Sequence, residues 1–155
     1  MWRLVVAVLM TLGAMGEAQP AEMPQADVHV AVQPDDRTAL DFTLTLKSPR
    51  TLVVPLDSLP WGTYPNLQIV AARADSIGTV LPKAVQFKEP VESPVTTIVA
   101  DQPIRGRVEL AQHVEGLGEA LRQSDVVVFW SYRLDVPPEL SSKRTGGWLV
   151  LRKAN

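Results

Sequence analysis

Residues 38–47 read TALDFTLTLK, and this stretch decides the fold class because apolar and polar residues alternate along it from residue 40 onward. Successive side chains of a β-strand point to opposite faces, so a period of two places one set against a core and the other toward water. The apolar set is Leu40, Phe42, Leu44 and Leu46. The stretch therefore predicts a strand that buries one face.

Similar strand-length segments extend from this stretch in both directions, separated by prolines and turn residues. They are rich in Val, Leu, Ile, Thr and aromatic residues, which favour strands, and apolar stripes with a helical period are nearly absent. Strands are predicted at residues 27–32, 51–56, 67–74, 104–110 and 147–153. The sequence thus indicates a domain built from short antiparallel strands.

The most hydrophobic run beyond residues 1–18 lies at 125–135, reads DVVVFWSYRLD, and is typical of a central strand. Trp130 and Tyr132 share one face, and we expect both in the core. Val127 and Phe129 give the other face an apolar start, so we expect that end of the strand to be covered on both sides. The run should pair with the final strand, which Trp148 begins, across a polar loop at 137–146.

One segment, AQHVEGLGEALRQS at 111–124, departs from the strand pattern because Val114, Leu117 and Leu121 follow a helical spacing. Glycines at 116 and 118 weaken a helix by about 1 kcal/mol each, so only a short helix over about 117–122 is predicted, crossing from one sheet to the other. These elements together predict an all-β fold, an antiparallel β-sandwich of about seven or eight strands with one short helix.

The predicted sandwich resembles immunoglobulin-like or fibronectin-like domains in its strand spacing alone. The cysteine and tryptophan landmarks of antibody domains are missing, so the resemblance transfers no site residues. A jelly roll or a small barrel is the alternative architecture. We expect a flexible N-terminal arm at 19–25 and a single sandwich domain at 26–155.

The first residues, 1–18, have the pattern of a secretory signal peptide. Arg3 supplies the positive charge, and the apolar run at 4–12 is too short for the roughly 20 residues that a transmembrane helix needs. Small residues place the cleavage after Ala18 or, alternatively, after Gly16. We therefore expect an exported protein, periplasmic or secreted, with no transmembrane segment after cleavage. The absence of an Asn-x-Ser/Thr acceptor beyond the leader favours a bacterial periplasm.

Composition excludes several function classes. The chain has no cysteine, which rules out disulfides, thiol catalysis and thiolate metal sites. Its charges are scattered, with 15 Lys and Arg against 17 Asp and Glu, which argues against a nucleic-acid partner. The two histidines, His29 and His113, lack the spacing of metal ligands. Neither a metal nor another cofactor is expected.

The candidate binding residues lie in a proline-rich loop at 58–66, SLPWGTYPN, which holds Trp61 and Tyr64. Prolines on both sides stiffen this loop, so the two rings could project outward as rigid anchors for a partner or a carbohydrate. The alternative is that Trp61 fills the open end of the sandwich. Truncating the two rings would distinguish the alternatives, since only a core plug would cost several kcal/mol.

These features favour a non-enzymatic binding or interaction module of the periplasm or envelope, which uses the loop at 61–65, with the loop at 137–147 as a second candidate. Its partner would be another envelope protein or a carbohydrate. No Gly-x-Ser-x-Gly motif is present, and we expect no catalytic residues. The alternative function is a small secreted hydrolase with loop-borne acids and bases. Its candidate residues are Asp57, Asp101, His113 and Glu115.

Overall fold

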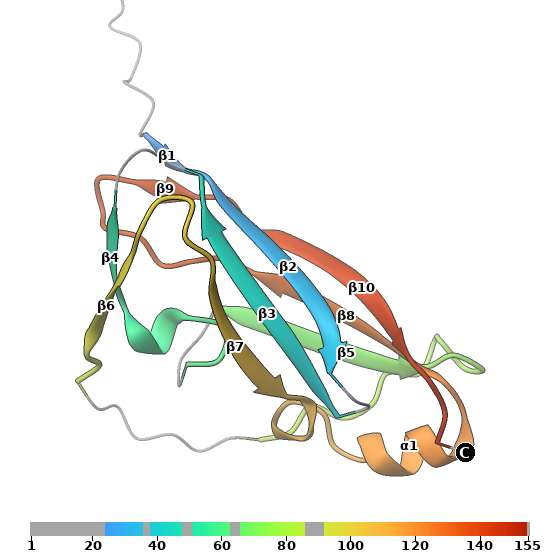
Figure 1. Ribbon diagram of the computed structural model, residues 1–155. Helices are drawn as coiled ribbons and strands as arrows, with labels where there is room; N and C mark the ends of the chain where they lie inside the picture. The colour runs from blue at the N-terminus through green and yellow to red at the C-terminus, as the bar shows by residue number, and fades with distance from the viewer. Residues whose placement is uncertain (1–23, 36–37, 48–50, 63–65, 86–91, 155) are drawn as a thin grey trace, which may run out of the picture.

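The computed structural model describes residues 24–35, 38–47, 51–62, 66–85 and 92–154, and two three-stranded antiparallel sheets dominate it (Figure 1). The first has the strand order β2-β3-β7, with bounds Val28–Asp35, Ala39–Leu46 and Ile104–Glu109. The second has the order β10-β8-β5, with bounds Thr145–Leu151, Val126–Tyr132 and Leu67–Arg73. The predicted all-β class with antiparallel sheets is confirmed.

Two smaller strand pairs lie beside the main sheets. Strand β4 (Leu52–Pro55) pairs antiparallel with β6 (Val95–Ile98), and β1 (Gln25–Ala26) pairs parallel with β9 (Ser141–Ser142). Short 3-10 turns η1 (Leu56–Ser58) and η2 (Leu110–Gln112) follow β4 and β7. The predicted short helix is present as α1 (Leu117–Gln123), and it connects β7 in the first sheet to β8 in the second.

The two main sheets share one core, to which their inward faces contribute alternate residues. Phe42 on β3 is fully buried and meets Trp130 on β8 edge to face, with ring centroids 5.6 Å apart. This geometry suits the aromatic quadrupole, and the area that the two rings remove from water favours the folded state. The other largest buried side chains include those of Leu40, Leu44, Leu46, Ile98, Leu110, Tyr132, Leu134 and Leu151. The alternation at 38–47 thus gives the inward face that was predicted.

Some boundaries and short strands differ from the predictions. Strand β6 was not predicted because its four residues, VTTI, are too few to show a period. Strand β10 begins at Thr145, which shortens the predicted polar loop, and part of that loop forms β9. Gln25, placed in the predicted arm, pairs with Ser141. The predicted leader and residues 19–23 lie outside the described residues.

Within the described ranges, no helix combines the length and apolar character needed to cross a membrane. The one α-helix found there, α1, has only 7 residues.

Candidate functional site

The outer face of sheet β10-β8-β5 carries a row of exposed apolar side chains. The strand register places Trp148 of β10 opposite Phe129 of β8, and Phe129 opposite Val70 of β5. Their exposed fractions are 68%, 42% and 46%. Directly opposed side chains lie close enough across strands to contact one another, so the three form one continuous surface. We call Trp148, Phe129 and Val70 the apolar platform.

The apolar character continues on one side of the platform and ends on the other. The next row toward α1 is Val150, Val127 and Ala72, and the next row away from it is Gly146, Ser131 and Gln68. The expectation that Val127 and Phe129 would both be covered was therefore half right. Val127 is buried at 8% exposure, whereas Phe129 is left open.

Two arginines lie at the polar end of this outer face. Arg133 directly follows β8 and Arg144 directly precedes β10, so both lie next to the last paired residues beyond Ser131, and Arg133 donates its backbone N–H to Asn66 O at 3.2 Å. Arg144 Nη1 donates to Ser131 Oγ at 3.1 Å, which holds the guanidinium over the sheet. Neither arginine forms an ion pair within the part of the chain that the structure describes. The platform thus has a basic end.

A shallow hollow adjoins this basic end. It has a volume of about 270 Å³ and an open mouth, and Arg133, Leu134, Asp135, Leu140 and Ser142 are among the residues that line it. Asp135 accepts a hydrogen bond from the Asn66 amide, and Ser142 Oγ donates to the Leu134 carbonyl. Arg133 therefore lies at the basic end of the platform and also lines the hollow.

The outer face of the other sheet, β2-β3-β7, has a different chemistry. Asp41, Thr43 and Thr45 of β3 point outward, and the β7 residues opposite the first two are Arg107 and Arg105. Arg107 Nε donates to Glu109 at 2.7 Å on the same face. A mixed-charge surface of this kind is ordinary for a strand face in water, whereas a soluble monomer rarely exposes a large contiguous apolar area. The apolar platform is therefore the feature that calls for a functional explanation.

The predicted binding residue Trp61 is half-buried and packs against the core rather than projecting outward. Its ring lies directly over Gly106 of β7, where a Cβ would come within 2.0 Å of Trp61 Cδ2. The loop itself is held tightly, because a Cβ at Gly62 would meet Asp57 O at 2.3 Å. This geometry fits the alternative in which Trp61 packs into the core better than the one in which it projects outward as an anchor. Tyr64 lies outside the described residues.

The aromatic residues predicted for the core are found there. Trp130 is 9% exposed, and Tyr132 is 1% exposed. The Tyr132 hydroxyl donates a buried hydrogen bond of 2.9 Å to the Ser58 carbonyl, which ties β8 to η1. Burial raises the pKa of the Tyr132 phenol, and the negative charge of Asp135 raises it further. The phenol therefore stays neutral and serves as a structural donor.

The residues of the hydrolase alternative do not converge. Asp101 lies beside the end of β3, where its N–H donates to Leu46 O, and its carboxylate pairs with Lys47 at 2.8 Å. His113 follows η2 at the opposite end of β3, whose length of 8 residues corresponds to about 27 Å. Glu115 follows His113 closely, whereas Asp57 belongs to η1. These groups do not share one reaction centre, and the described residues hold no cluster of ligands suited to a metal ion.

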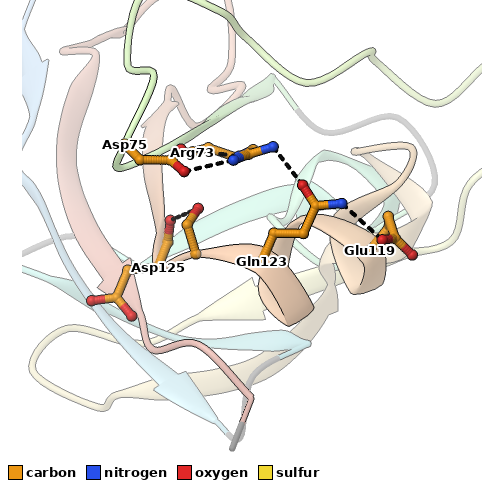
Figure 2. A network of polar contacts seen from close by, with 6 residues as sticks. Arg73, Asp75, Glu119, Gln123 and Asp125 are labelled. Carbon is orange, nitrogen blue, oxygen red and sulfur yellow. Dashed lines mark hydrogen bonds and ion pairs between the residues drawn. The ribbon is translucent and has the colours of Figure 1, made fainter.

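A network of polar contacts ties α1 to the end of β5 (Figure 2). Arg73 binds Asp75 through two hydrogen bonds and Gln123 through a third, and Gln123 donates to Glu119. Hydrogen bonds from the guanidinium of Arg73 lower the pKa of Asp75. Each exposed pair in this network contributes little stability. We interpret the network as contacts that position α1 beside the end of β5, because its charged groups bind one another.

The neighbouring carboxylate, Asp125, lies just before β8. It accepts the backbone N–H of Lys153 at 2.7 Å and pairs with Arg152 at 2.8 Å. These contacts, with the backbone hydrogen bond first, lower the pKa of Asp125. Asp125 thus pairs with the side chain of Arg152, whereas the Lys153 ammonium group forms no ion pair among the described residues.

Sequence reasoning missed the residues of the apolar platform. The sequence places Phe129 and Trp148 in two strands predicted to pair. That they lie directly opposite each other depends on the register of the β8–β10 pair. That register follows from where the connecting loop ends, and β10 begins two residues earlier than its predicted start. A search for aromatic residues on the outward positions of two paired strands would have found them.

No family model matches this chain, and a search of curated proteins finds no match either. The function is therefore argued from the geometry of the surface.

Proposed function

We propose that this protein is an exported, non-enzymatic β-sandwich module that binds a partner through the outer face of sheet β10-β8-β5. The observation that carries the proposal is the apolar platform, in which Trp148, Phe129 and Val70 lie side by side and exposed. Export is inferred from the signal-like residues 1–18. The site of binding moves from the loop at 61–65 to this face, because the Trp61 ring packs on Gly106.

The composition of the face supports binding rather than catalysis. Tryptophan and arginine are the residue types that most often dominate binding energy at interfaces, and an apolar centre with a polar rim is the usual anatomy. Here Phe129 lies on the central strand with Trp148 beside it on the edge strand, while Ser131, Gln68 and the two arginines form one rim. A flat strand face holds such groups rigidly, which reduces the entropy lost on binding.

Strand order supports an immunoglobulin-like arrangement for this module. In that fold, strands A, B and E share one sheet, and strands C, F and G share the other. If β2, β3, β5, β7, β8 and β10 are taken in chain order as A, B, C, E, F and G, the two observed sheets have these memberships. Strand β6 departs from the constant-type pattern because it pairs with β4 instead of extending the sheet of β7.

The proposal is tested by affinity capture from an envelope fraction of the host. The bait is the protein itself, compared with the double variant Trp148→Ser, Phe129→Ser and with Arg105→Ser on the opposite outer face. We expect a discrete partner that the double variant loses and the control retains, with all three proteins showing the same cooperative unfolding. A partner retained equally by the double variant would contradict the proposal.

A further inference from the structure

We infer that the occupant of the apolar platform is an acidic protein segment, in which an apolar anchor is followed by a carboxylate about 13 Å away. The inference rests on the proposed function and names the chemistry of its partner. It follows from the position of Arg133 and Arg144, next to the last paired residues of β8 and β10, where neither forms an ion pair among the described residues. The protein carries a formal net charge of −2, so this local positive end is a departure from its overall balance.

The spacing comes from the strand geometry. Phe129 and Arg133 are four residues apart on the same side of one chain, which corresponds to about 13 Å at the rise of an antiparallel strand. Ser131 and Gln68 lie between them as hydrogen-bonding groups. A segment lying along β8 would therefore meet an apolar row, then a polar row, then two cations.

The basic end is available to a partner carboxylate. Arg133 has no hydrogen-bond or ion-pair partner for its side chain among the described residues, and Arg144 contacts only neutral oxygens, Ser131 Oγ and the Asn66 carbonyl. Asp135, the next carboxylate along the chain, accepts the Asn66 amide and lines the hollow beside Arg133, but it forms no ion pair with either arginine. Guanidinium groups bind carboxylates in a paired geometry, so a partner carboxylate would bind on the exposed side of the two arginines, away from Asp135.

Charge also argues against a second copy of this chain as the occupant. If two copies docked face to face with their strands parallel, Arg133 and Arg144 would meet their own equivalents. If the strands ran antiparallel, they would meet the end that carries Arg152 and Lys153, where Asp125 pairs with Arg152 and accepts only the backbone N–H of Lys153, so that end keeps a positive charge. Like charges in contact oppose association, so a partner of opposite charge fits better.

The test selects peptides from a random dodecapeptide library displayed on phage, with the purified full-length exported protein as bait. The parallel baits are Arg133→Glu, Arg144→Glu, the platform variant Trp148→Ser, Phe129→Ser, and the control Arg105→Glu. We expect the protein and its control to enrich peptides with Asp or Glu about four residues from an aromatic residue. The charge-reversed bait should enrich Lys or Arg at that place and bind the acidic peptides at least tenfold more weakly.

The outcomes separate this inference from the proposed function. Peptides that require Trp148 but carry no acidic bias would overturn the inference and leave the proposed binding face standing. Peptides indifferent to the platform variant would overturn both. Sedimentation with phosphatidylglycerol vesicles and sedimentation velocity of the protein alone complete the test. Binding to vesicles or self-association that Trp148→Ser abolishes would overturn the inference. The occupant of the apolar platform would then be a membrane or a second copy of the chain.

Discussion

The hydroxyl of Tyr132 ties β8 to η1 by a side-chain hydrogen bond. It donates to the buried Ser58 carbonyl, so Tyr132→Phe leaves that acceptor without a partner in a site closed to water. We expect a loss of about 1–3 kcal/mol in the free energy of unfolding, measured in urea at unchanged m-value. The matched control is Thr97→Val, which removes a hydroxyl from an exposed position of β6. Equal stability of Tyr132→Phe and the parent protein would contradict the role given to this bond.

Gly106 and Trp61 form a pair in which the absence of one side chain makes room for the other. A Cβ at 106 would overlap the indole, so Gly106→Ala should cost about 1–3 kcal/mol through displacement of the ring. The same change in a Trp61→Ala background should cost almost nothing, because the ring is then gone. A double-mutant cycle by urea denaturation measures this coupling. Additive effects would mean that the ring does not lie over Gly106 in solution.

At the scale of the element, α1 is a helix that its own sequence weakens. Gly118 lies inside it, and a Cβ there would meet no other atom within 4 Å. Gly118→Ala should therefore raise the free energy of unfolding by about 0.5–1 kcal/mol, since alanine loses less conformational entropy in a helix. Thermal unfolding of the variant measures the gain. A destabilised variant would show that α1 needs the glycine for a reason other than its length.

The anchoring of α1 and the C-terminal residues through Asp125 should depend on pH. The pKa of Asp125 is lowered in the folded protein, so its contribution to stability is fully present above the unfolded pKa of about 3.9. The contribution is lost as the pH falls through the lower folded value. The difference in unfolding free energy between the protein and Asp125→Asn should therefore be present at pH 6 and shrink below pH 4. A difference in unfolding free energy that stays constant over this range would contradict a stabilising role for the ionised Asp125 carboxylate.

The elements that could be predicted from sequence are those long enough for the spacing of their apolar residues to repeat, every two residues in a strand or every three to four in a helix. The alternation at 38–47 identifies β3, and the apolar run at 125–135 identifies β8 and its pairing with the last strand. Strand β6 and the parallel pair of β1 with β9 are too short to carry a period. The apolar platform needed the exact register between strands, because a shift of one residue would exchange Phe129 for a core residue. Trp61 could be placed only once Gly106 was known to face it.

The whole molecule presents two outer faces of different character. One bears mixed charges over β2-β3-β7, and the other bears the apolar platform with its basic end over β10-β8-β5. Because the platform side chains are exposed, Trp148→Ser, Phe129→Ser should lose only the cross-strand contacts, about 0.2–1 kcal/mol for each pair. Binding should fall far more, by at least tenfold, as expected for aromatic anchors of an interface. The comparison of unfolding free energy with partner affinity separates a binding face from a structural one.

The most direct test of the binding face places a photo-crosslinking amino acid, p-benzoylphenylalanine, at position 148 in the protein expressed in its own host. The control carries the same group at position 105 on the opposite outer face. We predict a discrete crosslinked partner from position 148 and none from position 105. Crosslinks from position 105 alone, or none from position 148 in the folded, exported protein, would contradict it.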